Sequence, residues 1–233
     1  MKFKKTYAYA FWSALYLTLL FVIIAALSYF YFRDFLGNYT ILVDILFFFL
    51  ISFFLLSVGV QTIILLATIF GSSELGLAAI DLIITVLLIQ IVAIFGAFLF
   101  SRISEMKGNI MALKITIFIW MIVCFCAFLL HKELPNVAIY FYALGGILGL
   151  VLGAIQSLAR STYSKLLPET QDHATYFSFY DVTEKIAIVL GTLVYGFLYA
   201  MTDSMQWSVL SLALFFLAAF VVLSTMKKTK YVQ

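Results

Sequence analysis

The chain has 233 residues, of which 65% are apolar and 11% are charged, with a mean hydropathy of +1.15 and a net charge of +3. A soluble domain is closer to about half apolar and a quarter charged, so this composition excludes a protein that coats its surface with water-facing side chains. Two prolines and long charge-free runs favour membrane-spanning helices over a β-barrel, and the small net charge gives no sign of a nucleic-acid partner.

Six or seven apolar runs reach the roughly 20 residues that a helix needs to cross the hydrocarbon core. In chain order they cover about 10–32, 41–70, 76–100, 110–130, 137–160, 176–200 and 206–226. Polar loops are expected from Ser101 to Asn109 and over 161–175. The sequence therefore predicts an all-α, polytopic membrane bundle. Its parts are a basic N-terminal segment with an extra hydrophobic helix (1–40), a six-helix unit (41–228) and a cytoplasmic tail (229–233).

The lysines and arginines of the loops predict which side of the membrane each loop faces. Across the last six runs, nine of these cations fall on one side and only Lys132 falls on the other. The nine are Arg33, Arg102, Lys107, Lys114, Arg160, Lys165, Lys227, Lys228 and Lys230. Because such cations are enriched in cytoplasmic loops, we expect a cytoplasmic C-terminus, in the inner (plasma) membrane if the source is bacterial.

The first run breaks this pattern, because a spanning helix over 10–32 would place the lysines that precede it outside the cell. The run could be a signal-like segment, although its apolar stretch is long for that role. It could also lie in the interface or pack outside the bundle. We favour a third interpretation, in which the chain is the tail of a larger protein whose upstream spans set the direction of this helix.

The fifth apolar run contains glycines at four-residue spacing, followed by two polar side chains. At about 100° per residue, Gly145, Gly149, Gly153, Gln156 and Arg160 fall within about 80° of one another. In a membrane, such a glycine face lets another helix backbone approach closely. We therefore predict helix packing at the three glycines and inward-pointing polar groups at Gln156 and Arg160. For Arg160, an anchoring role at the membrane interface is an equal alternative.

The run at 176–200 carries a polar stripe, with Asp181, Lys185, Thr192 and Tyr195 in one sector of about 100°. Asp181 precedes Lys185 by four residues, which is the favourable order for a helical ion pair. These charges either belong to a solute path or are interfacial, since they lie in the first turns of the helix.

Two glutamines, Gln61 and Gln90, lie deep in apolar runs, where an amide must find hydrogen-bond partners. Each glutamine either forms a hydrogen bond to another helix, which is the interpretation that we favour, or forms part of the wall of a solute path. Cys124 and Cys126 point away from each other on a helix, so neither a metal site nor a disulfide is expected. The chain has no P-loop and no nucleophile elbow, and we expect neither an enzyme nor a cofactor.

Two neighbouring segments carry a family resemblance. GAIQSLARSTYSKLLPE at 153–169 and YFSFYDVTEKIAIVLGTLVYG at 176–196 resemble the C-terminal half of the vacuole-effluxer family of the major facilitator superfamily. The fungal members of this family are autophagy-related amino-acid exporters. The resemblance covers about 45–228.

The segment IQIVAIFGAFLFSRISEMKGN looks like the cytoplasmic loop signature of that superfamily. Gly96, Arg102 and Lys107 fit the signature, whereas Ser101 stands where the signature has an acid. In the first helix of this half, Val58 and Gly59 stand where many relatives have Asp-Gly.

The resemblance implies a transporter with two six-helix halves and the solute bound between them. The chain has room for one half, so we expect a fragment, a homodimer, or a half that pairs with a separate N-terminal half. Our first hypothesis is a module that moves a small solute, amino acids being the class that the resemblance suggests, by alternating access. Its candidate substrate-path or gating residues are Gln61, Gln90, Gln156, Arg160, Asp181, Lys185 and Tyr195. The alternative is a truncated or scaffold membrane protein that transports nothing.

Overall fold

The computed structural model of the protein describes residues 40–167 and 173–226, together with Trp12, Ser13, Leu15, Tyr16, residues 18–20 and Ile23. Within these residues it contains the helices α2 (Thr40–Ser73), α3 (Ala79–Lys107), α4 (Asn109–Leu129), α5 (Val137–Leu166), α6 (His173–Thr202) and α7 (Met205–Thr225). Each of the six is long and apolar enough to cross a membrane. The prediction of an all-α membrane bundle is therefore confirmed.

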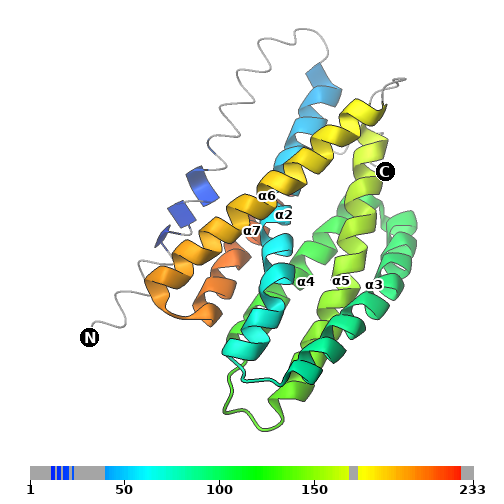
Figure 1. The fold of residues 1–233 in the computed structure, drawn as a ribbon. Coiled ribbons are helices and arrows are strands. Elements are labelled where there is room, and N and C mark those ends of the chain that lie inside the picture. Colours follow the sequence, from blue (N-terminus) through cyan, green and yellow to red (C-terminus); the bar gives the residue numbers. More distant parts are fainter. Residues whose placement is uncertain are drawn as a thin grey trace.

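The helices alternate in direction along the bundle (Figure 1). α3 packs along α5, α2 packs against α6 and α7, and α4 joins the two groups through contacts with α5 and α7. The connections that follow α2, α4 and α6 lie at one end of the bundle, whereas the start of α2 and the end of α7 lie at the other (Figure 1). Lys132 is at the first end and Lys107 and Lys165 are at the second, so these three described cations lie at the ends that the sequence predicts.

α3 extends further than its apolar run predicts, because residues 101–107, expected in a loop, continue the helix. Arg, Glu, Met and Lys are good helix formers, and this stretch contains neither glycine nor proline. The helix ends at Gly108, whose φ of 84° lies in the left-handed region that glycine adopts without strain. α4 begins at the next residue, so the expected loop is reduced to one glycine.

Two long-range hydrogen bonds tie the connections at the first end together. Glu74, in the connection between α2 and α3, accepts a hydrogen bond from the backbone N–H of Met205, 2.8 Å away at the start of α7. The Gln206 side chain donates to the carbonyl of Leu130 at 2.6 Å. An acid near a helix N-terminus satisfies free N–H groups and complements the helix dipole, whichever helix the fold brings to it.

Most of the first apolar run, with the lysines before it, lies outside the described residues, as does the tail at 229–233. The described residues between Trp12 and Ile23 are helical. The Ser13 hydroxyl lies 3.6 Å from the sulfur of Met201, so this stretch reaches the end of α6.

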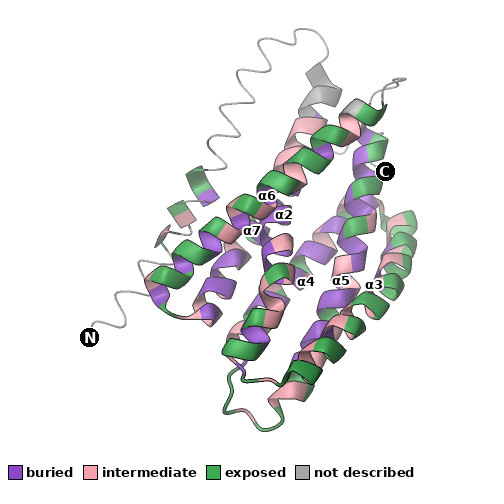
Figure 2. Ribbon diagram, in the orientation of Figure 1, coloured by how far each residue is buried: buried purple, intermediate pink, exposed green. Residues whose placement is uncertain are grey.

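Burial is uneven around the bundle (Figure 2). Trp120, Phe215 and Phe216 on α4 and α7 are completely buried, whereas only 11% of the most apolar window of α3 is buried. The outer side of α3 carries large exposed apolar side chains, including Ile83 and Phe95. Surfaces of this kind suit a lipid environment, where an apolar exterior costs nothing.

Candidate functional site

The site is built on a close contact between α3 and α5. A Cβ placed on Gly149 would lie 2.5 Å from the carbonyl oxygen of Ile89, and one on Gly153 would lie 1.8 Å from that of Ala93. A Cβ on Gly145 would lie 2.7 Å from the Thr85 methyl group. The glycine face of α5 thus contacts α3 directly. Close backbone approach of this kind lets dispersion and weak polar contacts hold helices together in a membrane.

A polar groove lies beside this contact, between α3, α5 and α6. Its volume is about 580 Å³. The lining side chains from α5 and α6 are mostly polar, and those from α3 are apolar. They are Ala93, Ile94, Ala97, Gly153, Gln156, Ser157, Arg160, Tyr180 and Glu184. The groove therefore combines a cation, an acid, an amide and two hydroxyl groups in a membrane-spanning unit.

Arg160 joins the two polar walls of the groove. Its guanidinium lies 3.7 Å from a carboxylate oxygen of Asp181 and 5.7 Å from the centre of the Tyr180 ring. The Tyr180 ring also stacks with the Phe53 ring of α2, and the two ring centres are 4.1 Å apart. The expected ion pair of Asp181 with Lys185 is thus replaced by one with Arg160, because the tertiary fold brings a cation from α5 closer than the next turn of α6 does.

Glu184 is held from the other direction by α2. The Gln61 side-chain amide donates a hydrogen bond to the Glu184 carboxylate at 2.5 Å. α6 can approach α2 this closely because of Gly191, where a Cβ would lie 2.1 Å from the Thr62 hydroxyl and 2.8 Å from the carbonyl of Val58. Gln61 is therefore an interhelical tie that also orients an acid of the groove wall.

Three predicted site residues lie elsewhere. Gln90 is exposed on α3 and does not line the groove. Lys185 is exposed on α6, next in sequence to Glu184 but outside the lining. Tyr195 is buried. The predicted polar stripe of 176–200 therefore does not line one groove, because its members lie in different surroundings. Asp181 and Lys185 are exposed, whereas the face toward α2 is formed by neighbouring positions such as Glu184 and Gly191.

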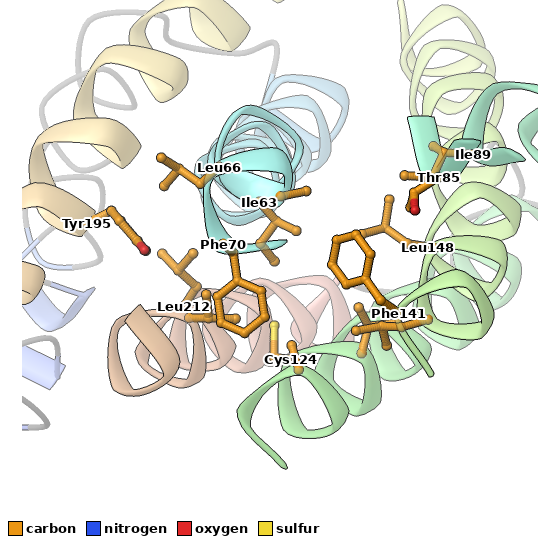
Figure 3. Close-up of a pocket in the computed structure, with 16 residues that line it drawn as sticks. Ile63, Leu66, Phe70, Thr85, Ile89, Cys124, Phe141, Leu148, Tyr195 and Leu212 are labelled. Atoms are coloured by element: carbon orange, nitrogen blue, oxygen red, sulfur yellow. The ribbon is translucent and has the colours of Figure 1, made fainter. Parts of the chain in front are cut away.

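Tyr195 belongs to a second, apolar cavity in the middle of the bundle (Figure 3). The volume of this cavity is about 40 Å³, and its walls include Phe70, Cys124 and Phe141. The Tyr195 hydroxyl is buried without a hydrogen-bond partner among the described residues, as is the Trp120 indole N–H. So small and apolar a space does not suit a polar solute, because a polar solute would lose its hydration without replacement hydrogen bonds.

A polar cluster connects the C-terminal end of α5 to the end of α3 and the start of α4. Asn109, which is buried at the start of α4, donates to the hydroxyls of Ser161 and Thr162 at 3.2 and 3.3 Å. Its side-chain oxygen accepts hydrogen bonds from Lys165, at 3.0 Å, and from Ser104. Two residues of the segment that resembles the loop signature lie at the end of α3: Ser101 is exposed, and the Arg102 guanidinium lies 5.3 Å from the centre of the Phe98 ring. The hydrogen bonds from this region to α5 come from Asn109 rather than from an acid at position 101.

Replacing Asn109 by alanine should lower the free energy of unfolding by about 1–3 kcal/mol, because the buried Thr162 hydroxyl on α5 and the half-buried Ser104 hydroxyl on α3 lose a hydrogen-bond partner. Ser161→Ala, which removes a single acceptor, should cost less, about 0.5–1.5 kcal/mol. Both values are measurable by unfolding in mixed detergent micelles. Equal stability of Asn109→Ala and the unaltered protein would contradict a structural role for this cluster.

The sequence analysis did not select Glu184, Tyr180 or Gly191 as site residues. A signal for two of them exists, since Glu184 and Gly191 are seven residues apart and therefore share a helix face. A carboxylate in line with a glycine predicts an acid directed at a closely packed neighbour. Among the residues that the structure describes, no group of three or more His, Cys, Asp or Glu side chains could hold a metal ion.

Residues 18–232 of the chain match the family model described as "Vacuole effluxer Atg22 like". A Bacillus subtilis protein described as the uncharacterized MFS-type transporter YxiO is 32% identical over 180 residues, which cover 77% of this chain and 40% of that protein. Autophagy-related protein 22 of Vanderwaltozyma polyspora is 30% identical over 173 residues, covering 69% of this chain and 32% of the relative. The corresponding protein of Kluyveromyces lactis is 28% identical, with 72% and 35% covered.

The chain thus spans about a third to two fifths of the length of these relatives. No solved structure matches the chain.

Proposed function

The chain belongs to the Atg22-like vacuole-effluxer family of membrane transporters, and we propose that it acts as one half of a solute transporter. The groove between α3, α5 and α6 is the proposed solute site. Its guanidinium, carboxylate and amide groups suit a small polar solute, and amino acids are the class that the family resemblance suggests. The observation that carries this proposal is the gathering of Gln156, Arg160 and Glu184 around one open groove in an otherwise apolar bundle.

The exposure of this groove argues for a second half. The side chains of Arg160 and Asp181 are 63% and 59% exposed, and Gln156 is also exposed. Lipid cannot satisfy such groups, so a stable arrangement in a bilayer needs a polar surface over them or water within them. A homodimer or a separate N-terminal half would provide that cover, and rocking of the two halves would give alternating access.

The direct test is flux of a mixture of radiolabelled amino acids into proteoliposomes that contain the full chain. We expect Gln156→Ala and Asp181→Asn to reduce this flux by about tenfold, which corresponds to about 1.4 kcal/mol in the barrier. Gln90→Ala is the matched control, since it removes an equally exposed glutamine outside the groove. Unchanged flux in Gln156→Ala, which alters the groove lining, and in Asp181→Asn, which alters the partner of Arg160, with insertion verified, would remove the groove from the mechanism.

The competing proposal is a scaffold or degenerate half that transports nothing. It is favoured by two departures from the family pattern, Ser101 in place of the loop acid and Val58 in place of the Asp of Asp-Gly. Crosslinking and sizing of the purified protein discriminate between the two. A dimer, or a neighbouring reading frame that encodes six further spans, supports the transporter, whereas a monomer without such a partner supports the scaffold.

For the orientation, we propose that the C-terminal end and the connection between α3 and α4 face the cytoplasm. The support is the separation of loop cations described above, with Lys132 alone at the other end among the cations of the last six runs. For a bacterial source the membrane is the inner (plasma) membrane. Reaction of a cysteine introduced at Lys132 with an impermeant reagent from outside intact cells would support this orientation.

A further inference from the structure

Glu184 lines the groove, and a second carboxylate, Asp181, is paired with the groove residue Arg160, so the two acids differ in their partners. Asp181 lies 3.7 Å from a guanidinium nitrogen of Arg160, so its charge is compensated. The hydrogen bond found for Glu184 comes from the neutral amide of Gln61 at 2.5 Å. The hydrogen bond thus connects an acid of α6 to a neutral side chain of α2, whereas the ion pair connects an acid of α6 to a cation of α5.

Glu184 also lies at depth in the bundle. Its partner Gln61 is about 12 residues before the end of α2 at Ser73, or roughly 18 Å of helix at 1.5 Å per residue. Because the hydrocarbon core is roughly 30 Å thick, the hydrogen bond lies closer to its middle than to either surface. The carboxylate is half-buried and borders the groove, so water that enters the groove has access to it.

The Gln61 amide suits both protonation states of this acid. With the carboxylate, its N–H group donates, as the structure shows. With a neutral carboxyl group, a half-turn of the amide presents its oxygen, which accepts the new O–H. A proton can therefore bind and leave without stranding a buried polar group.

From this arrangement we propose that Glu184 is the proton-binding site that couples solute movement to a proton gradient, and this inference rests on the proposed transport function. On one side of the membrane a proton from groove water bonds to a carboxylate oxygen of Glu184, and on the other side it returns to water. A single carboxylate is enough to hold a proton, and among the described residues no group of three or more His, Cys, Asp or Glu side chains could hold a metal ion.

The charges around Glu184 explain how a proton would affect the solute. α5 contributes Arg160 and α6 contributes Tyr180, while Asp181 of α6 pairs with Arg160 and α2 contributes the neutral Gln61. Lys185, the next residue of α6, is exposed outside the groove lining. The residues that α3 adds to the groove are apolar. Protonation removes the negative charge of Glu184 and leaves Arg160 as the charged side chain of the groove lining. An anionic group of the solute would then bind more tightly, and by linkage the solute would favour the protonated state.

The test uses the full chain in proteoliposomes with an imposed pH gradient and radiolabelled amino acids. Glu184→Gln, which mimics the neutral acid, should abolish gradient-driven accumulation while solute exchange continues at a rate that no longer depends on pH. Asp181→Asn is the matched control and should slow flux but keep its pH dependence. Gradient-driven accumulation by Glu184→Gln, or loss of pH dependence in Asp181→Asn alone, would overturn the proposal.

Infrared difference spectra of the purified chain in lipid nanodiscs give a second readout that needs no transport. Acidification should produce the C=O stretch of a protonated carboxyl group, and this band should be absent from Glu184→Gln. A band that persists unchanged in that variant would refute the assignment to Glu184. If the chain shows no flux but the band depends on Glu184, the transport function fails and the proton site stands.

Discussion

Gly149→Ala should destabilise the protein by about 1–3 kcal/mol, the range typical of overpacking a close contact. The added methyl group would lie 2.5 Å from the carbonyl oxygen and 2.9 Å from the Cα of Ile89. These are backbone atoms, which cannot rotate away as a side chain can, so α3 as a whole must move outward. The loss should appear as a lower free energy of unfolding in mixed detergent micelles.

Gly146→Ala provides the matched control on the same helix. A Cβ at Gly146 meets no atom within 4 Å, so the substitution adds no clash. Alanine is a better helix former than glycine by about 1 kcal/mol, and Gly146→Ala should leave stability unchanged or raise it slightly. Equal losses in the two variants would mean that general helix effects, rather than the contact of α5 with α3, determine the result.

Arg160→Met should reduce amino-acid flux by tenfold or more while lowering stability by less than about 1 kcal/mol. Arg160 is exposed in the single half, and exposed ion pairs contribute about 0–1 kcal/mol to stability. Its effect on transport should be larger because the guanidinium is the cation that lines the groove and holds Asp181 in place. A tenfold loss of flux corresponds to about 1.4 kcal/mol in the barrier.

Arg160→Lys separates charge from geometry in the same experiment. Lysine keeps the cation but lacks the planar guanidinium that lies over Tyr180 and reaches Asp181. We expect an intermediate flux. If Arg160→Met keeps full flux but unfolds easily, Arg160 is an anchor of the helix end, which is the alternative that the sequence also allowed.

The sequence by itself determined the membrane bundle, the order of its spans and the closeness of one helix pair. Composition and run length are properties of local stretches, and the spacing of Gly145, Gly149 and Gly153 places them on one face of any helix. It did not determine the extent of α3, whose polar end gives no apolar signal yet continues the helix to Gly108.

Only the tertiary structure decided which polar groups meet. Asp181 lies four residues before Lys185, but its partner is Arg160 on another helix. Gln61 and Gln90 look equivalent in sequence, yet one bonds to Glu184 and the other is exposed on α3. The physical reason is that helical periodicity fixes the angles between side chains on one helix, whereas the rotation and separation of neighbouring helices depend on all their contacts together. Here the close approach of α6 to α2 at Gly191 brings Glu184 rather than Asp181 to α2.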